Sequence, residues 1–300
     1  MPPRGSSKLD MRPAYVIEIE TPRKCILNGL WFGPKKPKQV IIFVHGLTGS
    51  IFSMRRGIAA MVNSRTAVLI FNNRGFEQVT EYKQKVGKNI KWNVGGAGRE
   101  VFTDCTDDIQ GAVRFARKAG VKNIYLAGHS TGCQKVIYWA SRYDGGRGVK
   151  GIILFGPLSD YAIALEQDRG GKLNRSLAHA RKLVRAGKPH ELMPANLGSW
   201  FVCDAQRFLS LYTPESVEEI FTYAQPKKIP KTLRSVRVPI LTLLAGAEEH
   251  TKRPVKELVQ WFDSSIRSQH KVLVVPKVNH GFKGGERVVA RAIRSFMSSS

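Results

Sequence analysis

The sequence lacks the marks of several protein classes. Its four cysteines (Cys25, Cys105, Cys133 and Cys203) lie far apart and form no C-x-x-C pair, which argues against a disulfide scaffold and a cysteine-based zinc site. No apolar run is long enough to cross a bilayer, and the first ten residues include no apolar segment typical of a signal peptide. We therefore expect free thiols, no membrane span and a location in the cytoplasm.

Acidic residues are scarce relative to basic ones. The chain has 48 Lys and Arg against 23 Asp and Glu, a formal net charge of +25. Such a balance favours attraction to nucleic acids, anionic lipids or anionic substrates. The basic residues are spread along the chain, however, and no nucleic-acid-binding motif is evident. We expect a basic, solvated surface and no specific nucleic-acid partner.

The sequence does contain a regular alternation of short apolar runs with helical patterns. Continuous apolar runs are typical of parallel strands that helices cover on both faces. The pattern predicts an α/β fold with a mostly parallel central sheet, and an antiparallel pair at one sheet edge over 15–20 and 25–31. The predicted parallel strands are 40–44, 67–71, 123–127, 151–155, 240–244 and 271–275. The main predicted helices are 109–116, 134–142, 254–262 and 286–297.

Two stretches interrupt this alternation. Residues 72–101 are expected to form a long loop, and long loops are often functional. Their glycine cluster at 95–98 follows no predicted strand and lacks the Lys-Ser/Thr ending of a P-loop, so we expect no phosphate cradle there. Residues 161–237 are expected to form a helical lid, rich in Arg and Lys in its early part. The predicted core domain comprises 1–160 and 238–300.

One short motif carries the chemistry. The predicted strand 123–127 leads into Gly128-His129-Ser130-Thr131-Gly132, and a predicted helix follows. In this strand–turn–helix context a G-x-S-x-G segment holds its serine on a tight, strained turn, and the glycines remove Cβ clashes. We therefore predict that Ser130 is a nucleophile.

A serine hydroxyl needs a base, and the base needs a partner that orients it. In folds with this serine turn the three groups follow one another along the chain as nucleophile, acid and base. The base should therefore lie after the last predicted strand, where His280 occurs in Val-Asn-His-Gly-Phe. The acid should follow the predicted strand 240–244, where Glu248 and Glu249 are both candidates. The spacing from Gly246 favours Glu249, so the residues themselves leave both open.

An oxyanion hole needs two backbone N–H groups directed at the developing charge. One is expected from Thr131, the residue after the nucleophile. The second is expected from Leu47, in the His-Gly-Leu-Thr-Gly loop after the early strand 40–44. The neighbouring His45 is expected to shape this turn without transferring protons.

These segments resemble α/β-hydrolases over residues 40–282. A closer likeness is to a mainly fungal α/β-hydrolase family that includes esterases of hydroxamate siderophores. It rests on Gly-His-Ser-Thr-Gly-Cys-Gln at 128–134, Gly-Pro-Leu-Ser-Asp at 156–160 and Arg-Phe-Leu-Ser-Leu at 207–211. Related bacterial sequences have an Asp-Glu-aromatic stretch shortly before Arg-Pro. Matched onto Arg253 and Pro254, that pattern implies that Glu248 is the acid, although the family usually has Asp there.

Together these features predict a serine carboxylic-ester hydrolase that acts on a small-molecule ester through Ser130, His280 and Glu248. The resemblance and the basic lid favour aromatic-acid or siderophore-like esters. An acyltransferase or thioesterase with the same triad is one alternative, and a non-catalytic polyanion-binding protein is another. We expect no metal and no organic cofactor, because the triad and the backbone donors supply the chemistry.

Overall fold

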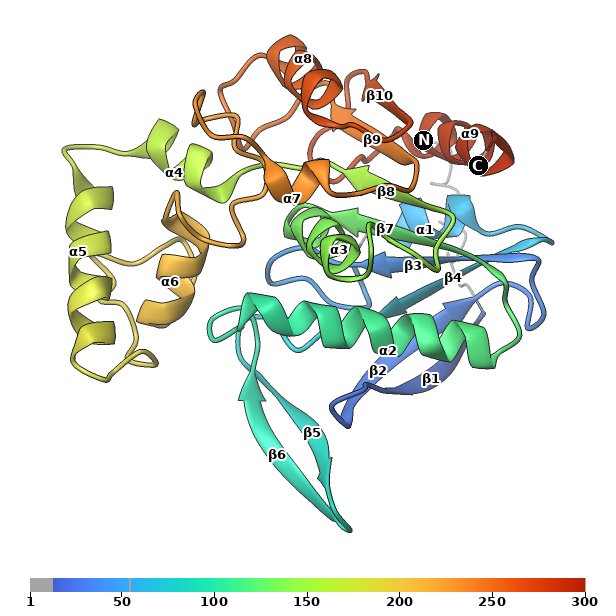
Figure 1. The fold of residues 1–300 in the computed structure, drawn as a ribbon, viewed down its shortest axis with the longest axis horizontal. Helices are drawn as coiled ribbons and strands as arrows, with labels where there is room; N and C mark the ends of the chain where they lie inside the picture. Colours follow the sequence, from blue (N-terminus) through green and yellow to red (C-terminus); the bar gives the residue numbers. More distant parts are fainter. Residues whose placement is uncertain (1–12, 54, 300) are drawn as a thin grey trace, which may run out of the picture.

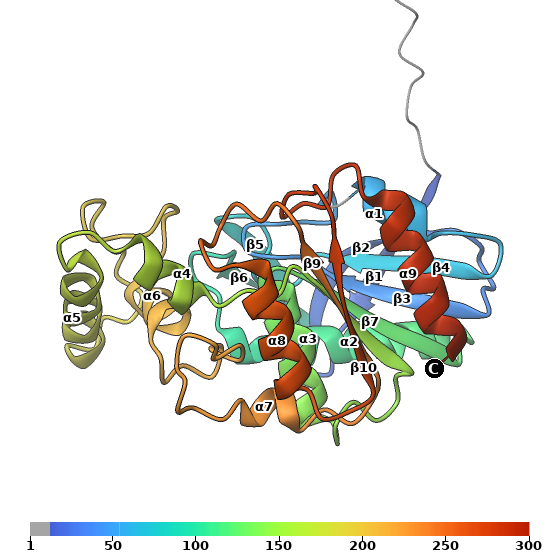
Figure 2. The same cartoon turned by 90° about the horizontal axis from the view of Figure 1, so that it is seen from above.

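A single mixed sheet forms the centre of the molecule (Figures 1 and 2). The computed structural model describes residues 13–53 and 55–299. Within them the strand order is β10-β9-β8-β7-β3-β4-β2-β5-β6, and β1 pairs with β2. The strands are β1 (Ala14–Glu20), β2 (Cys25–Phe32), β3 (Gln39–Val44), β4 (Thr66–Phe71), β5 (Thr80–Val86), β6 (Asn89–Gly95), β7 (Asn123–His129), β8 (Gly151–Phe155), β9 (Ile240–Ala245) and β10 (His270–Val275).

Helices cover both faces of the parallel part of this sheet. Strands β10, β9, β8, β7, β3 and β4 pair in parallel, as the sequence predicts. Successive side chains of a strand point to opposite faces, so Ile42 belongs to an apolar cluster with residues of α2, α3 and α8, and Ile41 to a second cluster with residues of α1 and α9. The helices are α1 (Arg55–Met61), α2 (Cys105–Lys118), α3 (Thr131–Arg142), α4 (Asp160–Gln167), α5 (Lys172–Arg185), α6 (Ala205–Tyr212), α7 (Lys231–Arg234), α8 (Val255–Ser265) and α9 (Glu286–Ser299), with a 3-10 turn at Phe102–Asp104.

The expectation of a long loop over 72–101 is wrong. Strands β5 and β6 form an antiparallel hairpin there, which belongs to the same sheet and projects beyond the other strands in Figure 1. A short turn at Gly87, which has a φ of 60°, connects the two strands. The glycine cluster therefore does follow a strand. Its Gly98 brings the backbone close to the carbonyl oxygen of Val202.

The antiparallel pair β1–β2 lies at one edge of the sheet, as predicted, because β1 pairs with β2 alone among the described strands. Strand β2 is not an edge strand, because it pairs with β4 and, at its beginning, with β5 as well as with β1. The sheet therefore continues beyond β2 into the hairpin.

Residues 161–237 contain most of α4 and all of α5, α6 and α7. Helices α4, α5 and α6 lie beyond the carboxyl ends of the parallel strands (Figure 1), whereas α7 packs against α3. Helices α5 and α6 share a small apolar cluster that includes Leu177 and Phe208. The division into a core domain and a lid domain remains a prediction. No helix in the described part of the chain is long and apolar enough to span a membrane.

A buried set of charges anchors α6 to the core. Arg207 on α6 is fully buried, donates hydrogen bonds to Glu218 at 2.5 and 3.1 Å, and forms an ion pair with Glu100 at 3.0 Å. Glu100 also pairs with Lys135 of α3 at 2.5 Å. Burial opposes ionisation of Glu100, but Lys135 and Arg207 lower its pKa overall. The charges on α6 and α3 thus meet at one carboxylate.

Candidate active site

Ser130 lies between the end of β7 and the beginning of α3. Its backbone has φ 54° and ψ −125°, a conformation that few residues other than glycine adopt. The flanking glycines allow the turn: a methyl group at Gly128 would overlap the backbone of Gly132, and one at Gly132 would overlap the carbonyl oxygen of Val44. The sequence pattern and the local geometry therefore agree at this turn.

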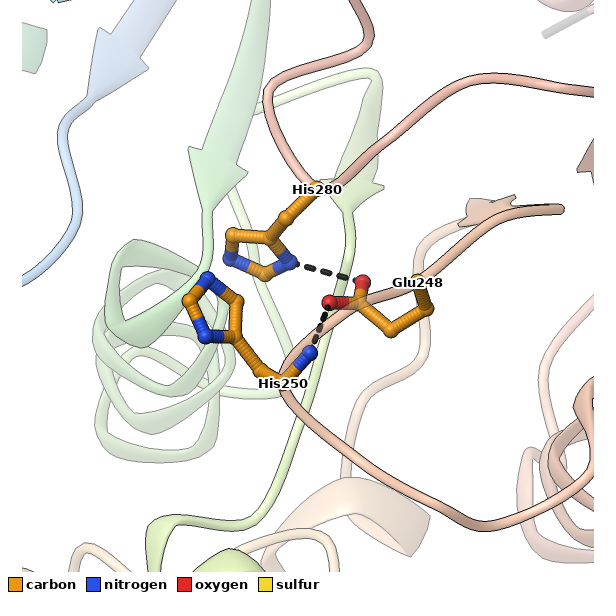
Figure 3. Close-up of side chains that lie close together, drawn as sticks. All are labelled: Glu248, His250 and His280. Atoms are coloured by element: carbon orange, nitrogen blue, oxygen red, sulfur yellow. Dashed lines mark hydrogen bonds and ion pairs between the residues drawn. The ribbon is translucent and has the colours of Figure 1, made fainter.

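His280 and Glu248 come together from two different loops. His280 follows β10, Glu248 follows β9, and the His280 Nδ1 lies 2.8 Å from a Glu248 carboxylate oxygen (Figure 3). Both side chains are only 9% exposed. Burial raises the pKa of Glu248, but the hydrogen bond and charge of His280 outweigh it and lower the pKa overall. An ionised Glu248 accepts the Nδ1–H, which leaves Nε2 as the proton acceptor.

Glu249 performs a different task from Glu248. Its carboxylate accepts a hydrogen bond from the backbone N–H of His280 at 2.8 Å. On the other side of the same residue, His129 Nε2 donates to the His280 carbonyl oxygen at 3.0 Å. Burial lowers the pKa of His129 to about 4, so that ring is neutral near pH 7. Glu249 and His129 thus hold the backbone of the loop that carries His280, a role that no sequence pattern indicated.

Ser130 and His280 face the same cavity. Both residues line it. The backbone of Ser130 is also attached to the end of β8, because its N–H donates to the Phe155 carbonyl oxygen at 2.9 Å. Among the described residues, no hydrogen bond joins the Ser130 hydroxyl to His280. Catalytic hydrogen bonds of this kind are often long without substrate and tighten when it binds.

The two expected oxyanion donors flank Ser130. Thr131 is the first residue of α3, so its N–H has no acceptor within the helix. Leu47 follows Gly46, and a methyl group at Gly46 would lie 2.8 Å from the Cβ of Ser130. The loop after β3 therefore passes directly beside the serine. The ring of His45 is fully buried, which lowers its pKa to about 4, in keeping with a neutral, shaping role.

The cavity has a volume of about 1160 Å³ and lies between the strand ends and helices α4, α5 and α6. Its lining includes two exposed cations, Arg169 and Lys172, and the carboxyl group of Asp160. Burial, together with the nearby charge of Glu218, raises the pKa of Asp160 to about 7. The Gln134 amide donates to this carboxyl group at 3.1 Å. Sequence reasoning did not identify Asp160 as a cavity residue.

A family model described as "Protein of unknown function (DUF1749)" matches residues 35–293. No curated protein matches this sequence.

Several solved structures are similar to the chain along nearly its whole length. DcsB, in a complex with its substrate analogue, is 16% identical with a TM-score of 0.67, covering 96% of this chain and 99% of that one. Est1E from Butyrivibrio proteoclasticus, with ferulic acid bound, is 17% identical with a TM-score of 0.61, covering 94% and 98%. The Pyrococcus furiosus esterase Pf2001 is 16% identical with a TM-score of 0.60, covering 99% and 96%. This likeness confirms the predicted α/β-hydrolase fold, and the closer likeness to fungal siderophore esterases remains a prediction.

Proposed function

The chain belongs to the DUF1749 family, whose description states no activity, and we propose that it is a serine carboxylic-ester hydrolase. The observation that carries the proposal is the meeting of a strained Ser130 with the His280–Glu248 pair at one cavity. A strained backbone persists only where the surrounding structure imposes it, and such residues cluster at active sites. A buried histidine that a carboxylate orients is the partner that a serine nucleophile requires.

In the proposed reaction His280 Nε2 takes the proton of the Ser130 hydroxyl as the oxygen attacks the ester carbonyl. Glu248 stabilises the imidazolium that forms. The N–H groups of Leu47 and Thr131 hold the negative oxygen of the tetrahedral intermediate. His280 then protonates the leaving alcohol, which produces an acyl-enzyme on Ser130. A water molecule that His280 activates in turn releases the acid and regenerates the enzyme.

The proposed substrates are esters with a bulky, anionic or phenolic acyl group, such as aromatic-acid or siderophore-like esters. A cavity of about 1160 Å³ exceeds the usual range for small-ligand pockets, so it has room for a large acyl group. Arg169 and Lys172 would attract a negative charge at the α5 side of the cavity. The ferulic acid bound to Est1E, a protein of the same fold, is an aromatic acid and agrees with this proposal.

Residues 161–237 are proposed to act as a lid over this cavity. Helices α4, α5 and α6 supply much of its lining, including Ile163, Leu173 and Phe208. These apolar side chains would contact the acyl group and exclude water from the reacting atoms.

The substitution Ser130→Ala tests the function directly. It should abolish both the hydrolysis of p-nitrophenyl esters and the labelling by a fluorophosphonate probe, while the melting temperature stays within a few degrees of the wild type. Ser141→Ala is the matched control, because Ser141 lies on α3, which follows Ser130, and within the described part of the chain its hydroxyl bonds to the Tyr138 carbonyl oxygen alone. Equal turnover by Ser130→Ala and Ser141→Ala would refute the proposal.

The substrate class has its own test. Hydrolysis of a carboxylate-bearing ester should exceed that of its neutral methyl-ester analogue at low ionic strength, and added salt should reduce the difference. The double substitution Arg169→Gln/Lys172→Gln should remove it. A preference that neither salt nor the double substitution alters would contradict the electrostatic argument.

A further inference from the structure

Three potential metal ligands gather on one side of the cavity. The side chains of Glu248, His250 and His280 each offer a ligand atom, and these atoms all lie within 4.8 Å of one another (Figure 3). The rings of His250 and His280 meet edge to face with their centroids 4.7 Å apart. The backbone N–H of His250 donates to Glu248 at 3.1 Å, which fixes the loop between these two residues. Glu248 thus contacts both histidines, one through its ring and one through its backbone.

Two imidazoles and one carboxylate are a ligand set that suits Zn²⁺. A tetrahedral zinc ion with bonds of about 2.0–2.1 Å needs ligand atoms that are about 3.3 Å apart. Glu248 and His280 already bring two such atoms to 2.8 Å. His250 is exposed, so its side chain can rotate to complete the triangle at little cost.

His129 is not counted among the zinc ligands, although its ring centroid lies 4.9 Å from that of His280. Its Nε2–H is committed to the His280 carbonyl oxygen. His250 and His280 both line the cavity, so an ion held between them can be reached from there. The fourth coordination position would be taken by water.

We propose that Glu248, His250 and His280 bind one Zn²⁺ ion, and that the bound ion inhibits the enzyme. The inhibitory part rests on the proposed function, because an ion at His280 and Glu248 occupies the base and its partner. The ion binds Nδ1 in place of its proton, which moves through solvent to Nε2, so Nε2 can no longer accept the proton of Ser130 and hydrolysis stops. Removal of the ion restores the pair, so the inhibition is reversible. His250 has no part in the proposed hydrolysis and serves here as the ligand that makes the site selective for a metal.

Direct binding tests the metal site without turnover. Calorimetric titration of the full-length Ser130→Ala chain with Zn²⁺ should give one site per chain. Adding His250→Asn should weaken the affinity at least about tenfold, since even outer partners of metal ligands contribute that much. His179→Asn, which removes a histidine of α5 that is outside the cluster, should leave the affinity unchanged. No binding, or the same affinity with and without His250, would overturn the site.

Inhibition is tested on the wild-type chain with a p-nitrophenyl ester. Zn²⁺ should inhibit hydrolysis, EDTA should restore it, and His250→Asn should raise the inhibition constant by the factor by which it weakens binding. Activity that EDTA abolishes and Zn²⁺ restores would overturn the inhibitory role. If the wild-type chain hydrolyses no ester, zinc binding that depends on His250 still supports the metal site, and the proposed function alone fails.

Discussion

The different contacts of Glu248 and Glu249 predict that their amide variants behave very differently. Glu248 accepts from the ring of His280, whereas Glu249 accepts from its backbone N–H. Glu248→Gln and Glu249→Gln are the same chemical change at adjacent positions, so each is the control for the other. Both keep an oxygen that can accept a hydrogen bond, and both remove one negative charge.

The expected size of the effect follows from the distance. An imidazolium and a carboxylate whose charges are about 4 Å apart attract each other by about 4 kcal/mol at the effective dielectric of a protein surface. Losing that attraction in the transition state lowers kcat about 10³-fold. The amide can also donate to Nδ1 and select the wrong tautomer of His280, which extends the loss towards about 10⁴-fold. Glu249→Gln weakens a hydrogen bond by about 1 kcal/mol, so kcat should fall by less than about tenfold.

The assay is the steady-state hydrolysis of a p-nitrophenyl ester by both variants, with melting curves to show that each is folded. A loss of about 10³-fold in Glu249→Gln with little change in Glu248→Gln would refute the assignment of the acid. Losses below tenfold in both variants would refute the triad itself.

Three further substitutions probe the anchor, the oxyanion loop and a buried acid. Arg207→Met leaves Glu218 buried without its cation, which should cost about 3–5 kcal/mol and lower the Tm by about 5–8 °C in calorimetry; an unchanged Tm would contradict the anchoring role. Gly46→Ala places a methyl group 2.8 Å from the Cβ of Ser130 and should reduce kcat about 10²-fold with the same substrate, and full activity would show that the loop yields easily. Burial raises the pKa of Glu219 from 4.5 to about 7, so the folded chain retains a proton that the unfolded chain releases above pH 4.5. Stability should therefore fall as the pH rises from about 4.5 through 7, and Tm measurements on Glu219→Gln should show a smaller fall.

The parallel part of the fold could be predicted because each of its strands is a continuous apolar run. Those runs report burial on both faces, which is the physical property that defines such strands. The hairpin of β5 and β6 escaped prediction because most of its side chains are exposed and several are lysines. The hairpin therefore has no run of apolar residues that would mark its strands as buried. Apolar residues at helical spacing located α2 and α8, because that spacing reports burial of one helix face.

The candidate site could be predicted only where local sequence determines geometry. The turn at Ser130 depends on its own glycines, so five residues between a predicted strand and a predicted helix were enough to indicate it. The choice between Glu248 and Glu249 depends on how two loops from separate strands meet, and adjacent residues in one loop have almost the same spacing to every motif. The hydrogen bonds of Glu249 and His129 to the backbone of His280 have no side-chain pattern of their own.

The backbone conformation of Ser130 has a consequence for how this protein can be improved. A positive φ at a residue other than glycine costs about 1–3 kcal/mol, and glycine would relieve most of that strain. A Ser130→Gly variant should thus tolerate heat better than the natural chain while lacking its nucleophile. A screen for thermal tolerance alone would therefore enrich inactive proteins, and laboratory evolution of a robust version has to select for turnover and heat resistance at the same time.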